Sequence, residues 1–412
     1  GGHGVRHRWK VLGVGFAANA SFSAAFSGIP TTAVFLRSGY RLDNHSLGLV
    51  LGMLGLGIAV SELPWGLLTD RWGDRRVLLL GLLSTAAALA GLASFAAPRG
   101  AHVAGVAVLA LGLLLVGLLG GSVNGSSGRA VMAWFSEGER GLAMSIRQTA
   151  VPAGGGVGAL ILPALASHLG FASVYAVLAL ACAVTAWFAW RWLHEPPHAG
   201  ADGADRSRAA RTAPADARAA MVSPLRHLGI WRVALGAGAL CVSQLAVVTF
   251  GAVFLHDFGH AGVLAISVTM ALVQTGAAIA RVGSGRWTDR HGNRRAYMRA
   301  CSLLTAALFA MLALATGMAG AHGAAMMTVF AALIVLGGVS ASAWHGVAFT
   351  ELATLAGTNR AGTALAMGNT CVFLTLFLTP LAIPFLLNIG SWSAVWMVAS
   401  AFALIALPVL PR

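Results

Sequence analysis

The chain contains twelve apolar runs, each long enough to cross a lipid bilayer. One crossing needs roughly 20 predominantly apolar residues, and the charged residues are bunched between the runs. Because 58% of the 412 residues are hydrophobic and only 10% are charged, with a mean hydropathy of +0.78, the composition excludes a soluble domain of this length. The expected spans are residues 10–36, 46–68, 77–97, 103–134, 141–168, 172–193, 228–255, 262–285, 296–319, 323–351, 361–388 and 391–410.

Each span must satisfy its backbone hydrogen bonds internally, and without an alternating strand pattern the helix is the structure that does so. We therefore expect an all-α membrane protein with twelve transmembrane helices. Residues 194–227 are rich in Ala, Pro, Asp and Arg and lack apolar periodicity, which predicts a cytoplasmic linker. It would divide the chain into an N-terminal six-helix bundle (1–193) and a C-terminal six-helix bundle (228–412).

The basic residues predict the orientation. Of the 27 Lys and Arg, only Arg37, Arg41 and Arg99 fall on the side reached after odd-numbered spans. The positive-inside rule therefore places the other side and both termini in the cytoplasm. Topology also explains the net charge of +14 better than nucleic-acid binding does, so the expected partners are the lipid bilayer and a small solute.

One eleven-residue sequence occurs twice, 219 positions apart. Residues 66–76 read GLLTDRWGDRR and residues 285–295 read GRWTDRHGNRR, each between the second and third span of its half. Duplicated six-helix halves are the build expected of a transporter with a site near the membrane midplane. The pairs at equal offset are Gly66 and Gly285, Thr69 and Thr288, Asp70 and Asp289, Arg71 and Arg290, Gly73 and Gly292, Arg75 and Arg294, and Arg76 and Arg295.

On these residues the whole chain resembles the major facilitator superfamily, whose loop pattern G-x-x-x-D-R-x-G-x-R-R both copies match. The resemblance implies two pseudo-symmetric six-helix bundles, alternating access, a monomer in a bacterial inner membrane and no cofactor. It also implies that both loops gate the cytoplasmic side and that Arg129, near the inner end of helix 4, partners Asp70. Positive-inside topology alone would explain the arginines, but not Gly, Asp and Gly at fixed spacing twice.

Polar residues deep in helices 1, 4, 7 and 10 are candidates for substrate binding. Counted from the nearest cytoplasmic charge, Asn19, Asn124, Gln244 and His345 lie roughly 13–24 Å in. The resemblance implies that these four helices line a central cavity. The alternative is that each residue only bonds neighbouring helices, at about 0.6 kcal/mol. Further lining candidates are Gln148, Gln274, Trp344 and Asn369.

Two arginines inside the membrane favour an anionic substrate. Arg147 in helix 5 and Arg281 in helix 8 lie roughly 6–10 Å inside the inner helix ends, where a charge is costly unless it meets water, an acid or an anion. Guanidiniums bind carboxylates in bidentate fashion. The alternatives for Arg281 are that it reaches the inner surface or closes an inner gate with Glu62, its repeat partner.

Three residues could carry a coupling proton. Glu62 and Glu351 are the carboxylates at membrane depth besides the loop aspartates, and His345 is the deep histidine. Histidine titrates near neutrality, and buried carboxyls can do so. Glu351 could instead pair with Arg360.

Residues 132–158 resemble the helix 4 to helix 5 region of bacterial facilitators for organic anions, cyanate-like anions and monocarboxylates. The shared residues are Trp134, Phe135, Glu139, Arg140, Gly141, Ala143, Met144, Arg147 and Gln148. Pro152, Gly155 and Gly156 also partly match a motif of drug/proton antiporters. However, Val151 replaces the expected glycine, and the upper half of helix 4 lacks an arginine.

The sequence thus predicts a proton-coupled symporter for a small organic anion, with a drug/proton antiporter as the alternative and a membrane sensor as a third reading. It contains no HExxH, Walker or G-x-S-x-G motif, so we expect neither an enzyme nor nucleotide-driven pumping. The cysteines Cys182, Cys241, Cys301 and Cys371 form no CxxC pattern, and we expect neither disulfides nor a metal site.

Overall fold

The computed structural model describes residues 2–194, 224–319, 324–357 and 361–410. Within these ranges, twelve helical spans are long and apolar enough to cross a membrane. The predicted fold class, an all-α membrane protein with twelve transmembrane helices, is confirmed. Most of the predicted linker, residues 195–223, lies outside the described residues, so the exact boundaries of the two bundles stay a prediction.

The N-terminal half, residues 2–194, contributes six spans. Several of them consist of more than one helical segment, and the direction of the helix can change where the segments meet. The spans are α1 with η1 and α2 (Gly2–Phe26, Ile29–Thr32, Ala33–Gly39), α3 (Asn44–Trp72), α4 with the π-helical η2 (Asp74–Gly91, Leu92–Ala96), α5 with α6 (Val106–Gly120, Ser122–Trp134), α7 with α8 (Glu137–Gln148, Ala150–His168) and α9 (Phe171–Trp192).

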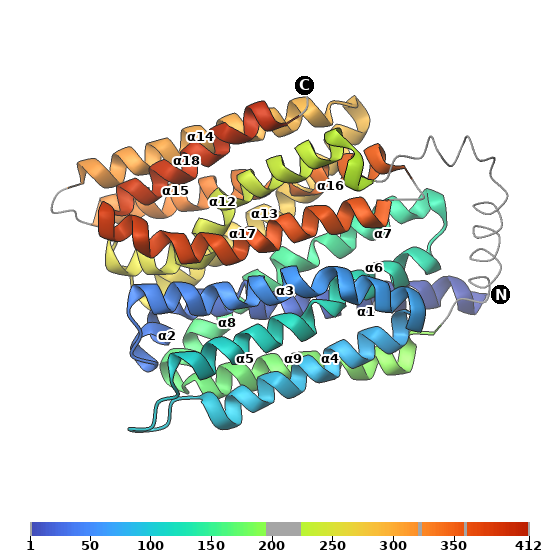
Figure 1. Ribbon diagram of the computed structural model, residues 1–412, viewed down its shortest axis with the longest axis horizontal. Helices are drawn as coiled ribbons and strands as arrows, with labels where there is room; N and C mark the ends of the chain where they lie inside the picture. Colours follow the sequence, from blue (N-terminus) through green and yellow to red (C-terminus); the bar gives the residue numbers. More distant parts are fainter. Residues whose placement is uncertain (1, 195–223, 320–323, 358–360, 411–412) are drawn as a thin grey trace.

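The C-terminal half, residues 224–410, contributes the other six. Figure 1 shows the two halves beside each other, with α3 and α17 adjacent where they meet. The elements are the short η3 (Pro224–Arg226), α12 (Leu228–Asp257), α13 (Val263–His291), α14 (Arg294–Met318), α15 with α16 (Ala324–Ser342, His345–Ala356), α17 (Ala361–Ile389) and α18 (Trp392–Val409).

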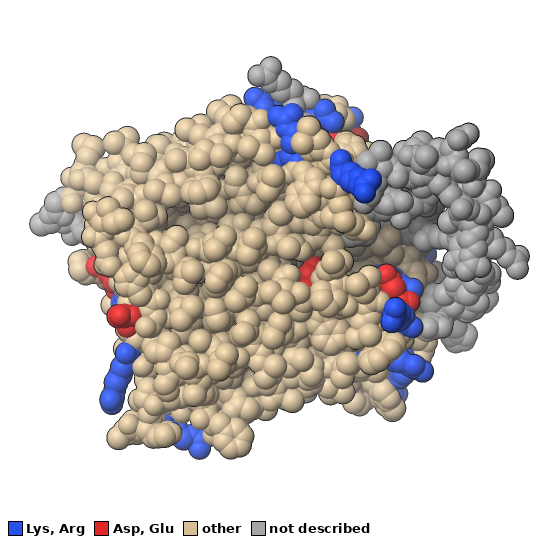
Figure 2. Space-filling view, in the orientation of Figure 1, with Lys and Arg blue, Asp and Glu red and all other residues tan. Residues whose placement is uncertain are grey.

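Charge marks the two ends of the helices. The helix order puts both repeated loops on one face of the molecule, which we call the basic face. Figure 2 shows Lys and Arg gathered mainly at that end, next to a broad uncharged surface. Large apolar side chains such as Leu111, Leu180 and Ile279 are exposed along the spans. Such a surface suits lipid rather than water.

The glycines in the repeated loops have a structural reason. Gly73 ends α3 with φ 89° and Gly292 ends α13 with φ 62°. A side chain is strained at positive φ, so glycine is the residue that lets each chain leave its helix in this way. At the other end of α3, the Asp43 carboxylate accepts a hydrogen bond from the Ser46 backbone N–H (2.8 Å), which holds the pKa of Asp43 below its usual value.

The halves pack most closely between α3 and α17, toward the face opposite the basic face. A Cβ on Gly48 would lie 2.1 Å from the Pro380 carbonyl oxygen, and one on Gly52 would lie 2.9 Å from the Phe377 carbonyl oxygen. Backbones this close gain dispersion contacts that larger residues would prevent.

An ion pair joins the halves at the same face. Arg37 of α2 donates from Nη1 and Nη2 to the two carboxylate oxygens of Asp257 at the end of α12, each at 2.7 Å, and Nη1 also donates to Asn44 Oδ1 at 3.0 Å. Nearby, His45 Nε2 lies 2.7 Å from Asn388 Nδ2. We call the first contact the Arg37–Asp257 clamp. The clamp thus holds the two halves in contact at the face opposite the basic face.

Removing the clamp should let the halves separate on that face. In a variant whose four native cysteines are replaced by alanine, His45→Cys and Asn388→Cys form a reporter pair, because the native side chains touch. Asp257→Asn should slow disulfide cross-linking of this pair about fivefold, since a bidentate, partly buried pair contributes about 1 kcal/mol. The rate of disulfide formation under a mild oxidant measures this effect.

Arg99→Gln supplies the control, because Arg99 is an exposed arginine on the same face. The exchanged pair Arg37→Asp with Asp257→Arg should restore cross-linking in part. An unchanged rate in Asp257→Asn would show that the clamp does not hold this face closed.

Candidate functional site

Six polar side chains from five helices converge between the two halves, and we call them the Glu62 cluster. Asn124 and Ser127 are three residues apart and so share one face of α6. The break between α5 and α6, at Gly121, precedes them directly. The members are Asn19 of α1, Glu62 of α3, Asn124 and Ser127 of α6, Arg147 of α7 and Asn369 of α17.

The Glu62 carboxylate accepts hydrogen bonds from both halves of the molecule. Its Oε1 accepts from Asn124 Nδ2 of the N-terminal half and from Asn369 Nδ2 of the C-terminal half, each at 3.3 Å. The side chain is buried, and among the described residues Oε2 has no hydrogen-bond partner. A buried carboxylate with one free oxygen has room for another donor or a proton.

Arg147 is enclosed by acceptors. Its Nη2 donates to Asn124 Oδ1 (2.8 Å) and Ser127 Oγ (3.0 Å), its Nε donates to Ser127 Oγ (3.2 Å), and the Asn124 carbonyl accepts as well. With the Asn19 amide oxygen turned toward the guanidinium, that oxygen accepts from Nε and Nη2 at 3.1 Å. A Cβ on Gly128 would lie 3.2 Å from Arg147 Cζ. The site is thus shaped around this guanidinium.

The Asn124 side chain links the two charges of the cluster. Its amide nitrogen donates to Glu62 while its amide oxygen accepts from Arg147. One carboxylate and one guanidinium are therefore held in a single hydrogen-bonded group. Satisfied in this way, the pair avoids the cost of an isolated buried charge.

Arg281 of α13 is buried without such compensation. Its Nη1 lies 3.5 Å from the Gln148 carbonyl oxygen of α7, at the limit of a hydrogen bond, and Nε has no partner among the described residues. No Asp or Glu of the described chain forms an ion pair with it, whereas His345 lies within electrostatic range. The structure has no ion pair between Arg281 and Glu62, so it does not contain the alternative gate. The Glu62 carboxylate instead accepts hydrogen bonds from Asn124 and Asn369.

Further polar side chains lie along the contact of α7 and α8 with α13 and α16, with Gln274 seven residues, about two turns, from Arg281 on α13. Gln148 approaches α16, where a Cβ on Gly346 would lie 3.3 Å from Gln148 Oε1. Gln274 of α13 packs against α8, where a Cβ on Gly155 would lie 3.0 Å from Gln274 Cδ. We call Arg281, Gln148, Gln274 and His345 the Arg281 site.

The other candidates for substrate binding lie differently. Gln244 of α12 is half-buried and accepts a long contact from Cys241 Sγ at 3.7 Å. Trp344 is fully buried in the apolar core of the C-terminal half, and its Nε1 has no described partner. His345 stacks on Phe349 with ring centroids 4.8 Å apart. Packing thus accounts for the burial of the Trp344 ring, and its role in substrate binding stays a prediction.

The repeated loops are held by ion pairs within their own halves. Arg129 of α6 contacts Asp70 (Nη1 to Oδ1, 3.1 Å) and Asp74 (Nε to Oδ1, 3.5 Å). Arg129 is therefore beside Asp70, where the sequence analysis expects it. The gating role of these residues stays a prediction.

In the C-terminal half, Arg294 and Arg295 contact Glu351 of α16 at 2.9 and 3.2 Å. The expected partner of Glu351, Arg360, lies outside the described residues, so that pairing stays a prediction. The two ion pairs hold Glu351 at the basic face, away from Glu62 and Arg281. Of the remaining gating candidates, Arg75 donates to the Trp190 carbonyl oxygen (2.9 Å). The others are exposed or half-exposed within the helices that flank the two turns, not in loops: Gly66 and Arg71 in α3, Arg76 in α4, and Gly285, Asp289 and Arg290 in α13.

Sequence reasoning missed three residue roles. Arg37 was used only to assign topology, and Asp257 was not singled out, although the two form the clamp. Ser127 was also missed. The spacing of three residues from Asn124 was its available signal, but serine is too common in helices to stand out without coordinates. The described residues contain no group of three or more His, Cys, Asp and Glu side chains able to hold a metal ion.

Comparisons with known proteins fit this architecture. The profile of the Major Facilitator Superfamily matches residues 14–374. An uncharacterized MFS-type transporter of Mycobacterium tuberculosis is 29% identical over 412 residues, covering 99% of this chain and 86% of the relative. The crystal structure of a D-xylose-proton symporter superposes with a TM-score of 0.76 over 97% of both chains at 15% identity, a likeness of fold alone.

Two further relatives match part of the chain. A probable galactarate/D-glucarate transporter of Bacillus subtilis is 26% identical over 193 residues, which are 46% of this chain and 41% of the relative. Probable anion transporter 5 of Arabidopsis thaliana is 30% identical over 156 residues, which are 38% of this chain and 34% of the relative. With the family profile spanning most of its length, this multi-pass membrane protein belongs to the Major Facilitator Superfamily and is a secondary transporter, not an enzyme.

Proposed function

We propose that this transporter carries a small organic anion, a carboxylate, across a bacterial inner membrane and that its transport is coupled to protons. The observation that carries the proposal is Arg281, a buried guanidinium that faces no acid among the described residues. A charge in such a place costs several kcal/mol unless an anion or water compensates it. A bound carboxylate would do so with paired hydrogen bonds.

Arg147 is the weaker candidate for direct substrate contact. Its Nε and Nη2 already donate to Asn19, Asn124 and Ser127, so a substrate that bound these two nitrogens would have to displace existing bonds. Arg281 keeps donors free, and Gln148, Gln274 and His345 nearby can orient the rest of a polar molecule. The anion transporters among the relatives support the same substrate class.

Glu62 is the favoured proton carrier. Its free Oε2 can accept a proton without breaking the two existing hydrogen bonds to Oε1. Protonation would remove one charge beside Arg147 and weaken the bond to Asn369, which belongs to the other half. His345 is the second choice, while Glu351 is committed to two ion pairs.

Orientation and assembly complete the proposal. The basic face lies in the cytoplasm, with both termini on that side, as the positive-inside rule favours. The Arg37–Asp257 clamp then closes the periplasmic side. The monomer is the transporting unit, because both charged sites lie within one chain.

One observation favours the alternative, a drug/proton antiporter. A buried carboxylate with a free oxygen, such as Glu62, also suits a lipophilic cation. Under that function Glu62 would be the ligand anchor and Arg281 would be dispensable. The two functions thus assign opposite importance to the two residues.

Neutralising Arg281 should abolish recognition of carboxylates. A hydrogen bond to a charged partner contributes about 1.5–3 kcal/mol, so Arg281→Gln should weaken substrate binding roughly 10- to 150-fold, and Arg281→Lys should fall between it and the unaltered protein. Counterflow in proteoliposomes, with D-glucarate and a panel of smaller mono- and dicarboxylates as probes, measures the effect.

Arg6→Gln is the matched control, because Arg6 is exposed. Equal carboxylate counterflow in Arg281→Gln and the unaltered protein would exclude Arg281 as the anchor. Transport of lipophilic cations that needs Glu62 but not Arg281 would establish the drug antiporter instead.

Glu62→Gln should separate transport from proton coupling. Glutamine retains an acceptor for Asn124 and Asn369 but cannot exchange a proton at neutral pH. We expect accumulation driven by a pH gradient to disappear, while carboxylate counterflow stays within about threefold of the unaltered rate, since no net proton movement is needed for exchange. Uptake with and without an imposed pH gradient measures both quantities.

Glu139→Gln serves as the control, since Glu139 is an exposed glutamate paired with Arg8. If Glu62→Gln still accumulates substrate against its gradient, the proton moves through another group, and His345→Gln becomes the next variant.

A further inference from the structure

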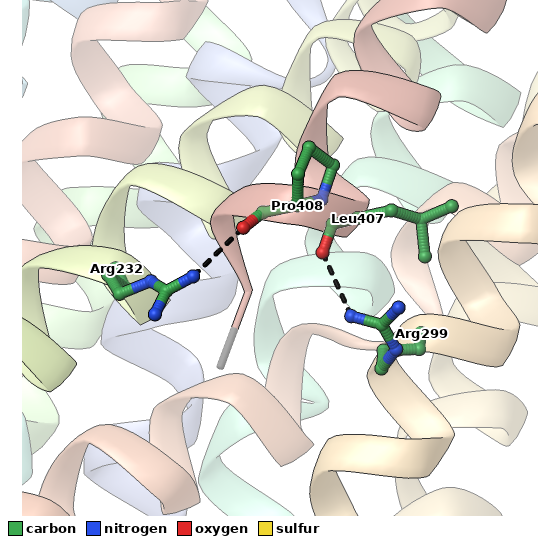
Figure 3. Close-up of a pocket in the computed structure, with 4 residues that line it drawn as sticks. All are labelled: Arg232, Arg299, Leu407 and Pro408. Atoms are coloured by element: carbon green, nitrogen blue, oxygen red, sulfur yellow. Dashed lines mark hydrogen bonds between the residues drawn. The ribbon is translucent and has the colours of Figure 1, made fainter. Parts of the chain in front are cut away.

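A second basic site lies away from the transport pathway, at the edge of the basic face. A cavity of about 490 Å³ is lined by Arg232 of α12, Arg299 of α14, and Leu407 and Pro408 of α18. Figure 3 shows the two guanidiniums on either side of the end of α18, each turned toward its backbone. Nothing in the proposed transport mechanism uses these residues.

The arginines use part of their donor capacity to cap α18. Arg232 donates from Nε to the Val409 carbonyl oxygen (3.0 Å) and from Nη2 to the Pro408 carbonyl oxygen (2.9 Å), and Arg299 donates from Nη1 to the Leu407 carbonyl oxygen (2.9 Å). Cations at a helix C-terminus are favourable.

Donors on both side chains remain for a ligand. Arg232 Nη1 and Arg299 Nε and Nη2 have no hydrogen-bond partner in the described chain, and neither arginine forms an ion pair with a described Asp or Glu. Two positive charges with spare donors around one cavity suit a phosphate group, which accepts several such bonds.

The surroundings of the cavity indicate where that phosphate comes from. About one turn deeper along each of the three helices lies a leucine that faces outward: Leu235 on α12, Leu303 on α14 and Leu404 on α18 are 54%, 54% and 48% exposed. Outward-facing leucines on membrane spans contact acyl chains. Because residues three or four apart share a face of a helix, each leucine lies on the same side of its helix as the residue that lines the cavity. Apolar surface thus follows the basic cavity into the membrane, as a lipid requires and a free anion does not.

We propose that this cavity binds the headgroup of an anionic phospholipid from the leaflet at the basic face. The phosphate lies between Arg232 and Arg299, and the acyl chains lie along Leu235, Leu303 and Leu404. Basic pockets between transmembrane helices are suited to such headgroups. The bound lipid joins the start of α12, the start of α14 and the end of α18, so it stabilises the C-terminal half.

The test uses the purified full chain, stripped of lipid in a neutral detergent. Its thermal unfolding midpoint is followed while dioleoyl-phosphatidylglycerol, dioleoyl-phosphatidylcholine or inorganic phosphate is added. Phosphatidylglycerol should raise the midpoint in a saturable way, because a ligand of the folded state stabilises it. Phosphatidylcholine and inorganic phosphate should each produce less than a tenth of that shift at equal concentration.

Variants assign the effect to the cavity. Arg232→Gln and Arg299→Gln should each raise the half-saturating concentration of phosphatidylglycerol about fivefold, and the double variant about 25-fold, from the usual contribution of one basic side chain near an anionic lipid surface. Arg226→Gln, an exposed arginine on the same face, should leave it unchanged. Because the glutamine variants also lose helix caps, Arg232→Lys with Arg299→Lys is included. It should retain more than half of the lipid-induced shift.

Several results would overturn the proposal. Equal stabilisation by phosphatidylcholine would mean that lipid acts without regard to charge. Equal stabilisation by inorganic phosphate would mean a site for a soluble anion. A loss of phosphatidylglycerol binding in Arg226→Gln as large as in the pocket variants, or none in the double glutamine variant, would place the lipid elsewhere.

Discussion

An arginine inside a membrane protein must meet an acid, water or an anion, because hydrocarbon cannot solvate its charge. Arg147 and Arg281 meet this requirement in opposite ways. Arg147 is surrounded by asparagine and serine acceptors and is linked through Asn124 to Glu62. Arg281 retains an unused donor. The first arrangement compensates the charge without a ligand, whereas the second leaves a donor to which a ligand could bind.

Both charges lie where they can influence the contact between the halves. Glu62 of the N-terminal half is bonded by Asn369 of the C-terminal half, and Arg281 of the C-terminal half approaches the Gln148 carbonyl of the N-terminal half. A proton on Glu62 or a carboxylate on Arg281 therefore changes the energy of bonds that must break when the halves move. A ligand can shift a conformational equilibrium only through such differences. Coupling then needs no relay between distant sites.

The sequence was sufficient for the parts of this structure that depend on a pattern. Apolar runs specified the twelve spans, and the repeated glycines marked the positive φ at Gly73 and Gly292 where two helices end. The sequence also identified Glu62, Arg147 and Arg281 as unusual, since charged residues are rare within membrane spans. It did not reveal which of them share hydrogen bonds, because Asn369 is 307 residues from Glu62 in the chain. Nor did it show that the Trp344 ring is fully buried in the apolar core of the C-terminal half, since an aromatic side chain in an apolar run can either pack in a core or line a cavity.

The two halves share the frame of the repeat but differ in the charges that they place on it. Position 62 is an acid in the first half, and its equivalent, 281, is an arginine in the second. The signature loops are reversed in the same way: an acid of the first loop pairs with an arginine of α6, and arginines of the second loop pair with an acid of α16. At the opposite face, Arg37 of the first half binds Asp257 of the second. The contacts between the halves do not pair equivalent positions. The Arg37–Asp257 clamp, the hydrogen bond from Asn369 to Glu62 and the contact of Arg281 with the Gln148 carbonyl each join positions that are not equivalent in the repeat. Arg281, which forms no ion pair with an acid of the described residues, is the position at which we propose that the carboxylate binds.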